Sequence, residues 1–114
     1  MCRGAAGRGQ LEILKWARAN GCPWDEETCS LAAQVGRLDI LKWARANGCP
    51  WNEKTCEYAA QGGHLEILKW ARENGCPWNE RTWWYATTGY SRNKTEVILW
   101  LRDNGCPGSH DEGH

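Results

Sequence analysis

The stretch Leu41–Trp51 reads Leu-Lys-Trp-Ala-Arg-Ala-Asn-Gly-Cys-Pro-Trp, and the chain repeats it. The same eleven residues occur at Leu14–Trp24, and Leu68–Trp78 differs from them only by Glu73. An altered copy follows at Ile98–Gly108. The first tryptophan of each copy comes 27 residues after the previous one, except for a last step of 30. A fixed period of this length indicates one supersecondary unit stacked in an array, so this stretch decides the fold.

Each unit is predicted to contain two helices and no strand. In the longer helix, expected at Leu38–Asn47, apolar side chains cover roughly 220° of the helical wheel at about 100° per residue. Its equivalents are Leu11–Asn20, Leu65–Asn74 and Thr95–Asn104. An Asn-Gly pair ends each of these helices, because glycine tolerates the left-handed backbone and the proline two residues later prevents continuation. The shorter helices are expected to begin after the N-caps Asp25, Asn52 and Asn79 and to run to about Gln34, Gln61 and Thr87.

The tryptophan after each proline has no apolar helix to join, and we expect it to fill the gap between units. These plug tryptophans are Trp24, Trp51 and Trp78, whereas Gly108 stands at the fourth position. We therefore predict one array over residues 1–106, with an incomplete first unit, and a polar C-terminal tail over residues 107–114.

Charge and hydropathy narrow the classes of partner. The 114 residues include 14 basic and 14 acidic side chains, so the formal net charge is zero. A strongly basic footprint for nucleic acid is absent. No apolar run approaches the roughly 18 residues that a membrane span needs. We expect neither nucleic acid nor a membrane as partner, and we expect a monomer.

The seven cysteines fall into two columns of the repeat: Cys22, Cys49, Cys76 and Cys106, and Cys2, Cys29 and Cys56. Stacked helices lie about 8–10 Å apart, whereas a disulfide needs Cα atoms within about 7 Å, so neighbours in one column are too far apart to pair. Pairing between columns would be incomplete, because Trp83 takes the slot after Cys76 and the total is odd. We expect seven free thiols and hence a reducing compartment, the cytoplasm or alternatively the nucleus.

No pattern for catalysis or for a metal is found in the sequence. A structural zinc site usually has a close Cys-x-x-Cys pair, whereas the nearest spacing here is seven, as in Cys22 and Cys29. The tail residues His110, Asp111, Glu112 and His114 could hold a metal loosely, but such a tail is more often only a polar terminus. Without a nucleophile–base pair or a phosphate-cradling loop, we predict no enzyme, no catalytic residue, no cofactor and no metal ligand.

The segment Gly63–Cys76 resembles the ankyrin repeat, with its Gly-His-Leu-Glu opening, apolar run and Asn-Gly before the turn. The pair Ala59-Ala60 resembles the paired alanines of that family's first helix, and the likeness extends over roughly Ala5 to Cys106. The resemblance implies an all-α, helix-turn-helix repeat solenoid of about four units. Ankyrin units have about 33 residues, so these shorter units would lack the β-hairpin finger, and the family's Thr-Pro-Leu-His is absent. Other solenoids of helix pairs stay open.

Differences between units point to a binding face on the short helices. Identical positions carry the stacking, whereas a binding face needs unequal residues. The residues equivalent to Trp84 in the other units are polar, so we expect this position to face solvent and the indole to be exposed. Tryptophan and arginine are enriched in binding hot spots. The predicted partner-binding residues are Arg81, Trp84, Tyr85, Lys54 and Glu57. The alternative is that Trp83 and Trp84 fold over the Gly89–Lys94 loop and close the end of the array.

An arginine recurs in every unit, at Arg18, Arg45, Arg72 and Arg102. It forms either a track for phosphate or acidic peptide, or a structural contact with a glutamate of the next helix or with a plug tryptophan. The ankyrin resemblance implies a protein-binding scaffold or adaptor, whose partner is another protein. Two alternatives remain: a thiol-rich metal-binding or redox protein, and a fragment of a longer structural array.

Overall fold

A computed structural model of the chain describes residues 2–8, 10–89 and 91–109. In these ranges the chain forms eight α-helices and no strand, which confirms the all-α prediction. The helices are α1 (Cys2–Gly7), α2 (Leu11–Ala19), α3 (Glu26–Gln34), α4 (Leu38–Ala46), α5 (Glu53–Gly62), α6 (Leu65–Glu73), α7 (Glu80–Thr88) and α8 (Lys94–Asp103).

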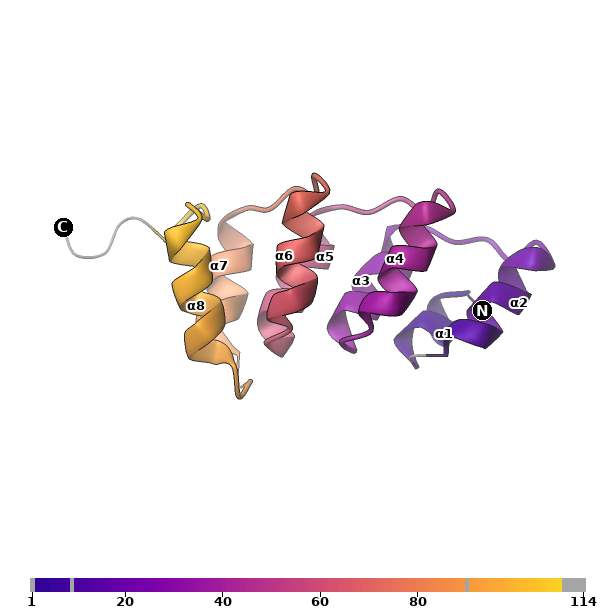
Figure 1. The fold of residues 1–114 in the computed structure, drawn as a ribbon, viewed down its shortest axis with the longest axis horizontal. Coiled ribbons are helices and arrows are strands. Elements are labelled where there is room, and N and C mark those ends of the chain that lie inside the picture. The colour runs from indigo at the N-terminus through magenta and orange to yellow at the C-terminus, as the bar shows by residue number, and fades with distance from the viewer. Residues whose placement is uncertain (1, 9, 90, 110–114) are drawn as a thin grey trace.

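The helices are arranged as pairs along one axis of an elongated molecule of 54 × 25 × 17 Å (Figure 1). Helices α1, α3, α5 and α7 pack directly against one another and form one row. Each of the helices α2, α4, α6 and α8 packs against the short helix that precedes it in the chain. The short helices are therefore the tight layer, and the long helices stand outside it with more space between them.

The turn after each long helix has the same construction in all four copies. In the second copy, the Asn47 side chain donates a hydrogen bond to the Trp43 carbonyl at 2.8 Å, and Gly48 has a φ of 87°. The Cys49 N–H donates to the Ala44 carbonyl at 3.0 Å and closes the helix. Asparagine is thus the C-cap, and each long helix ends one residue earlier than the sequence predicts.

The N-caps of three short helices are confirmed. The side chains of Asp25, Asn52 and Asn79 accept hydrogen bonds from backbone N–H groups two residues later, at 3.0, 3.0 and 2.9 Å. Each cap satisfies an N–H group that the first helical turn would leave without a partner.

Small side chains explain the close row of short helices. The paired alanines of α3 and α5, Ala32-Ala33 and Ala59-Ala60, are buried, so neighbouring backbones approach closely. The long helices contribute branched side chains such as Ile40 and Leu41, which are also fully buried.

The plug tryptophans fill the wider gaps between long helices, as predicted. Each one meets the first tryptophan of the following unit edge-on, with ring centroids 5.7 Å apart for Trp24 and Trp43. The next two pairs, Trp51–Trp70 and Trp78–Trp100, have centroids 5.7 and 6.0 Å apart. Trp16 is 64% exposed, whereas the other three first tryptophans are partly buried against the core.

Substitution of two equivalent tryptophans tests this packing. Trp43→Ala should lower the free energy of unfolding by about 2–3 kcal/mol, because it removes an aromatic pair and partly buried apolar area. Trp16→Ala, the matched control, should change it by less than about 0.5 kcal/mol, since the side chain is mostly in water. Urea unfolding followed by circular dichroism measures both. Equal losses for the two variants would contradict the proposed role of the tryptophan pairs.

Candidate interaction surfaces

The arginine column is tied to the turns by two contacts. The Arg45 guanidinium lies over the Trp51 ring, 4.3 Å from its centroid, and Nη1 donates to the Cys49 carbonyl at 2.6 Å. Arg18 and Arg72 lie over their plug tryptophans at 4.2 Å and bond the equivalent carbonyls. Of the two structural alternatives, the structure shows stacking on the plug tryptophan. Arg102 is exposed, and Gly108 stands where its tryptophan would be.

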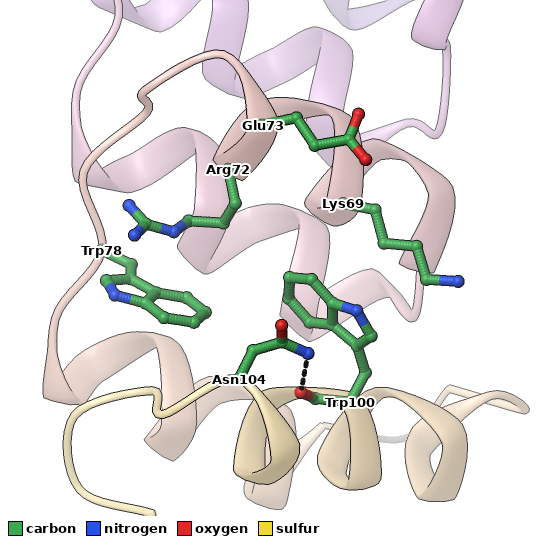
Figure 2. A pocket seen from close by; sticks show the side chains of 6 residues that line it. All are labelled: Lys69, Arg72, Glu73, Trp78, Trp100 and Asn104. Carbon is green, nitrogen blue, oxygen red and sulfur yellow. Dashed lines mark hydrogen bonds between the residues drawn. The ribbon is translucent and has the colours of Figure 1, made fainter.

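A groove opens between the outer helices α6 and α8 (Figure 2). Its volume is about 470 Å³, and its lining residues are Lys69, Arg72, Glu73, Trp78, Trp100 and Asn104. An equivalent groove of about 320 Å³ between α2 and α4 is lined by Lys15, Arg18, Ala19, Trp24, Trp43 and Asn47. The arginine and asparagine of each groove already bond backbone carbonyls. The grooves therefore follow from the spacing of the long helices, and their polar groups are largely committed to the fold.

Four of the five predicted partner-binding residues lie at the surface of α5 and α7. Lys54, Arg81 and Trp84 are exposed, with 57% of Trp84 accessible, and Tyr85 is partly buried. The Trp84 ring meets Tyr85 edge-on at 5.1 Å, and Tyr85 meets Tyr58 of α5 at 6.4 Å. An aromatic run thus crosses from α5 to α7 and ends in an exposed indole. Tyr58 was absent from the predicted set, although it occupies the repeat position of Tyr85.

Glu57 is a correction to that set. It is only 4% exposed, and its equivalent Ser30 is 1% exposed, so the expected wet slot is buried. Glu57 lies on α5, which has α3 on one side and α7 on the other. Trp84 lies on α7, the last short helix of the described part, and one of its sides has no short helix packed on it. The exposure of Trp84 follows from the place of α7 in the row rather than from polarity of the slot.

The two adjacent tryptophans of α7 have different environments. Trp83 is partly buried against the core and lies near the last turn, where a Cβ on Gly108 would be 3.6 Å from the Trp83 Cβ. Trp84 is exposed. Trp83 therefore lies beside the last turn, and the exposed Trp84 does not close the end of the helix row. Tyr90, in the lengthened loop, lies outside the described residues.

One pair of cysteines corrects the expectation of seven free thiols. Cys2 and Cys22 form a disulfide, with Cα atoms 6.1 Å apart, and the other five cysteines are free and buried. The disulfide joins two different columns of the repeat, and no two cysteines of one column are linked in the described residues. Such a pair joins a short helix to the turn that ends the long helix of the same unit, 20 residues later.

The equivalent thiols of the next two units contact each other. Cys29 is hydrogen-bonded to Cys49, and Cys56 is hydrogen-bonded to Cys76. The bond to Cys49, together with burial, raises the pKa of Cys29 well above its usual range. The same bond lowers the pKa of Cys49, against the effect of burial, and Thr28 and Arg45 contribute in the same direction. Burial raises the pKa of Cys106, which has no partner thiol, to about 11.

Metal and membrane sites are not found in the described ranges. In residues 2–8, 10–89 and 91–109, no three side chains of His, Cys, Asp or Glu come together in a way that could hold a metal ion. His110, Asp111, Glu112 and His114 lie outside the described residues. Among the described helices, none has the length and apolarity to cross a membrane.

Comparison with known proteins does not add a relative. No family model matches the chain, and no curated protein is significantly similar to it.

A conservative substitution tests the arginine contact. Arg45→Lys should lower the free energy of unfolding by about 1–2 kcal/mol, because lysine cannot both stack flat on Trp51 and reach the Cys49 carbonyl. Arg102→Lys is the matched control, since Arg102 has no tryptophan beneath it, and it should cost less than about 0.5 kcal/mol. Chemical denaturation measures both. A neutral Arg45→Lys would show that the contact contributes nothing to stability.

Proposed function

We propose that the chain is a protein-binding scaffold or adaptor, built as an ankyrin-like solenoid of about four units. The observation that carries the binding role is the exposed indole of Trp84, which rests on Tyr85. The residues Lys54, Tyr58, Arg81, Trp84 and Tyr85 are named here the α5–α7 face.

Three observations support the solenoid. The helix pairs follow the 27-residue period, the turns after the long helices have one construction, and each short helix packs on the next. The segments between units contain no strand within the described ranges, as expected for ankyrin-like units without a finger. A partner of such a solenoid would contact the helices themselves.

The α5–α7 face has the features of a small hot spot. The Trp84 indole is about half exposed, so a partner that covers it removes apolar surface from water. Its contact with Tyr85 restricts the side chain before binding, and less rotamer entropy is then lost. Lys54 and Arg81 stand at equivalent positions of α5 and α7, and Glu27 of α3 occupies the same repeat position with the opposite charge. The partner we propose is a protein surface with an apolar hollow for Trp84 and acidic side chains opposite the two cations.

We further propose that the protein is a monomer of the cytoplasm, or alternatively of the nucleus. The proposal of a reducing compartment is supported by five free, buried cysteines rather than the seven expected from the sequence. Reduced thiols in this number are typical of compartments with a thiol buffer.

Substitution of the exposed indole tests the binding role. Trp84→Ala should weaken binding of a partner, isolated with the wild-type chain from the native source and then purified, by about 30-fold or more, as for a hot-spot residue worth about 2 kcal/mol. The melting temperature should change little, because Trp84 is mostly in water. Trp16→Ala is the matched control, since Trp16 is an exposed indole on α2, near the other end of the molecule, and it should leave affinity unchanged.

The charged residues supply a second, independent test. Lys54→Glu with Arg81→Glu should reduce the association rate and make binding less sensitive to salt. Isothermal titration and surface plasmon resonance measure the two effects. Unchanged affinity in both the Trp84 variant and the charge variant would refute the α5–α7 face as the binding site.

A further inference from the structure

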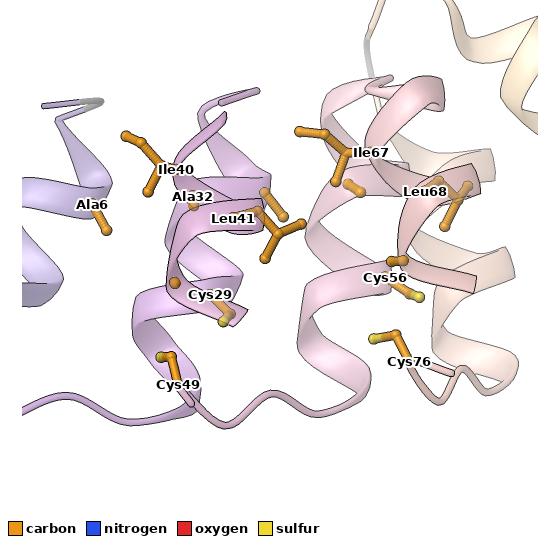
Figure 3. Close-up of a cluster of buried hydrophobic side chains, with 14 of the residues drawn as sticks. Ala6, Cys29, Ala32, Ile40, Leu41, Cys49, Cys56, Ile67, Leu68 and Cys76 are labelled. Atoms are coloured by element: carbon orange, nitrogen blue, oxygen red, sulfur yellow. The ribbon is translucent and has the colours of Figure 1, made fainter. Parts of the chain in front are cut away.

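Three units of the array carry a pair of cysteines at the same two repeat positions. In each pair, 20 residues separate a cysteine of a short helix from a cysteine of the turn after the following long helix. The first pair, Cys2 and Cys22, is a disulfide. The pairs Cys29/Cys49 and Cys56/Cys76 hold free thiols in hydrogen-bond contact, and Figure 3 shows each turn cysteine beside its helix partner at the lower edge of the buried cluster.

We propose that Cys29/Cys49 and Cys56/Cys76 are dithiol sites that a peroxide oxidises to disulfides, each of which fastens a short helix to the turn that ends the long helix of its unit. The site is thus a redox modification site that the first unit already shows in its oxidised form.

The backbone around the three pairs supports equal behaviour. The turn cysteine of each pair donates its N–H to the alanine carbonyl five residues earlier, at 3.0, 3.0 and 2.9 Å. The glycine before it has a φ of 86°, 87° and 86°. With this backbone arrangement, the Cα atoms of Cys2 and Cys22 are 6.1 Å apart, inside the range of about 4.4–6.8 Å that disulfides span. Oxidation of the other two pairs therefore needs side-chain rotation and little movement of the backbone.

The groups around Cys49 favour it as the attacking thiolate. The hydrogen bond with Cys29 and the positive charge of Arg45 both lower the pKa of Cys49, whereas burial and the charge of Asp25 act in the opposite direction. The Thr28 hydroxyl is fully buried, and its oxygen has no partner of normal hydrogen-bond geometry. This hydroxyl lies close to the Cys49 sulfur and lowers the pKa of Cys49. Thr55 is buried and unpartnered in the same way in the next unit, where Arg72 takes the place of Arg45. At Cys49 this arrangement lowers the pKa and so stabilises the thiolate, which is the reactive form of a thiol.

The chemistry requires one peroxide for each pair. Cys49 releases its proton, and the thiolate sulfur attacks one oxygen of hydrogen peroxide, so that an S–O bond forms and the O–O bond breaks. The hydroxide that leaves takes up that proton and becomes water. Cys29 then loses its proton and attacks the sulfur of the Cys49 sulfenic acid, so that the S–S bond forms and the S–O bond breaks. The departing hydroxide takes up the second proton, and two thiols with one peroxide have given one disulfide and two waters.

Burial of the four thiols favours a small oxidant over a large one. All four of these thiols are fully buried in the structure, so a molecule little larger than water reaches them more readily than a peptide disulfide such as oxidised glutathione. A dithiol reductant reverses the reaction when the turn opens.

The fourth unit provides an internal control. Cys106 occupies the same column as Cys49 and Cys76, but Trp83 stands where its partner cysteine would be. Cys106 is equally buried and free, and its pKa is raised to about 11, so it is a protonated thiol without a resolving partner. Peroxide should leave it reduced under conditions that oxidise the two pairs.

The test is a thiol titration of the full chain in denaturant, before and after treatment with hydrogen peroxide, followed by mapping of disulfide-linked peptides. The titre should fall from five to one, with links Cys29–Cys49 and Cys56–Cys76 and with Cys106 remaining. Each link closes a loop of about 20 residues and should raise the melting temperature by on the order of 10 °C, reversibly with dithiothreitol. A titre that stays at five, or links that join different chains or different units, would overturn the proposal.

Variants separate the pairs from general oxidation. Cys29→Ser should abolish the first link and about half of the thermal shift, while the Cys56–Cys76 link still forms. The matched control Cys106→Ser should retain both links and the whole shift. If Cys29→Ser fails to fold, the peptide map of the wild-type chain still decides the question. Loss of Cys106 at the same rate as Cys49 would show that pairing does not direct the oxidation.

Discussion

The contact on which the array depends is the stacking of an arginine guanidinium on the plug tryptophan of its own turn. The Arg45 guanidinium stacks on the Trp51 ring and also donates a hydrogen bond to the Cys49 carbonyl, so it joins the long helix to both residues of its turn. The edge of Trp51 then meets Trp70 of the next unit. One side chain thus connects the inside of a unit to the join between units. In this role the ring face and a backbone carbonyl supply the negative potential beside the guanidinium.

The two layers of the molecule follow from side-chain volume. Alanine pairs allow α3 and α5 to lie close, whereas the long helices carry indoles and are held further apart. Open grooves remain between the long helices, and both have the same lysine, arginine, tryptophan and asparagine positions, although Glu73 of one replaces Ala19 of the other. A surface that is the same in every unit carries little information about a partner. The α5–α7 face differs from its equivalents, and this difference is the reason to place specificity there.

Local features of the fold could be predicted from the sequence, since they depend on neighbours along the chain. The N-caps, the glycine turns and the helix pairs need only propensity and hydrogen bonding within a few residues, and they are found as expected. The burial of Glu57 could not be predicted in this way. A polar residue indicates water only where its helix has an open side, and α5 has a helix on both sides. The Cys2–Cys22 link was missed for a related reason, because the distance between the two columns depends on how a helix pair folds back on its own turn.

The fourth unit differs from the other three in residues that the repeat otherwise keeps. In the fourth copy, Leu99 replaces a lysine, Gly108 replaces the plug and Trp83 replaces a cysteine. Trp83 packs beneath the last turn, where the indole of a plug would otherwise be needed, and Leu99 is 43% exposed. Trp84 is exposed on α7, which has a short helix packed on one of its sides. Cys106 lacks a partner thiol for a different reason, because Trp83 of its own unit stands at the cysteine position. The proposed binding residue and the unpaired thiol of this unit therefore have separate structural causes.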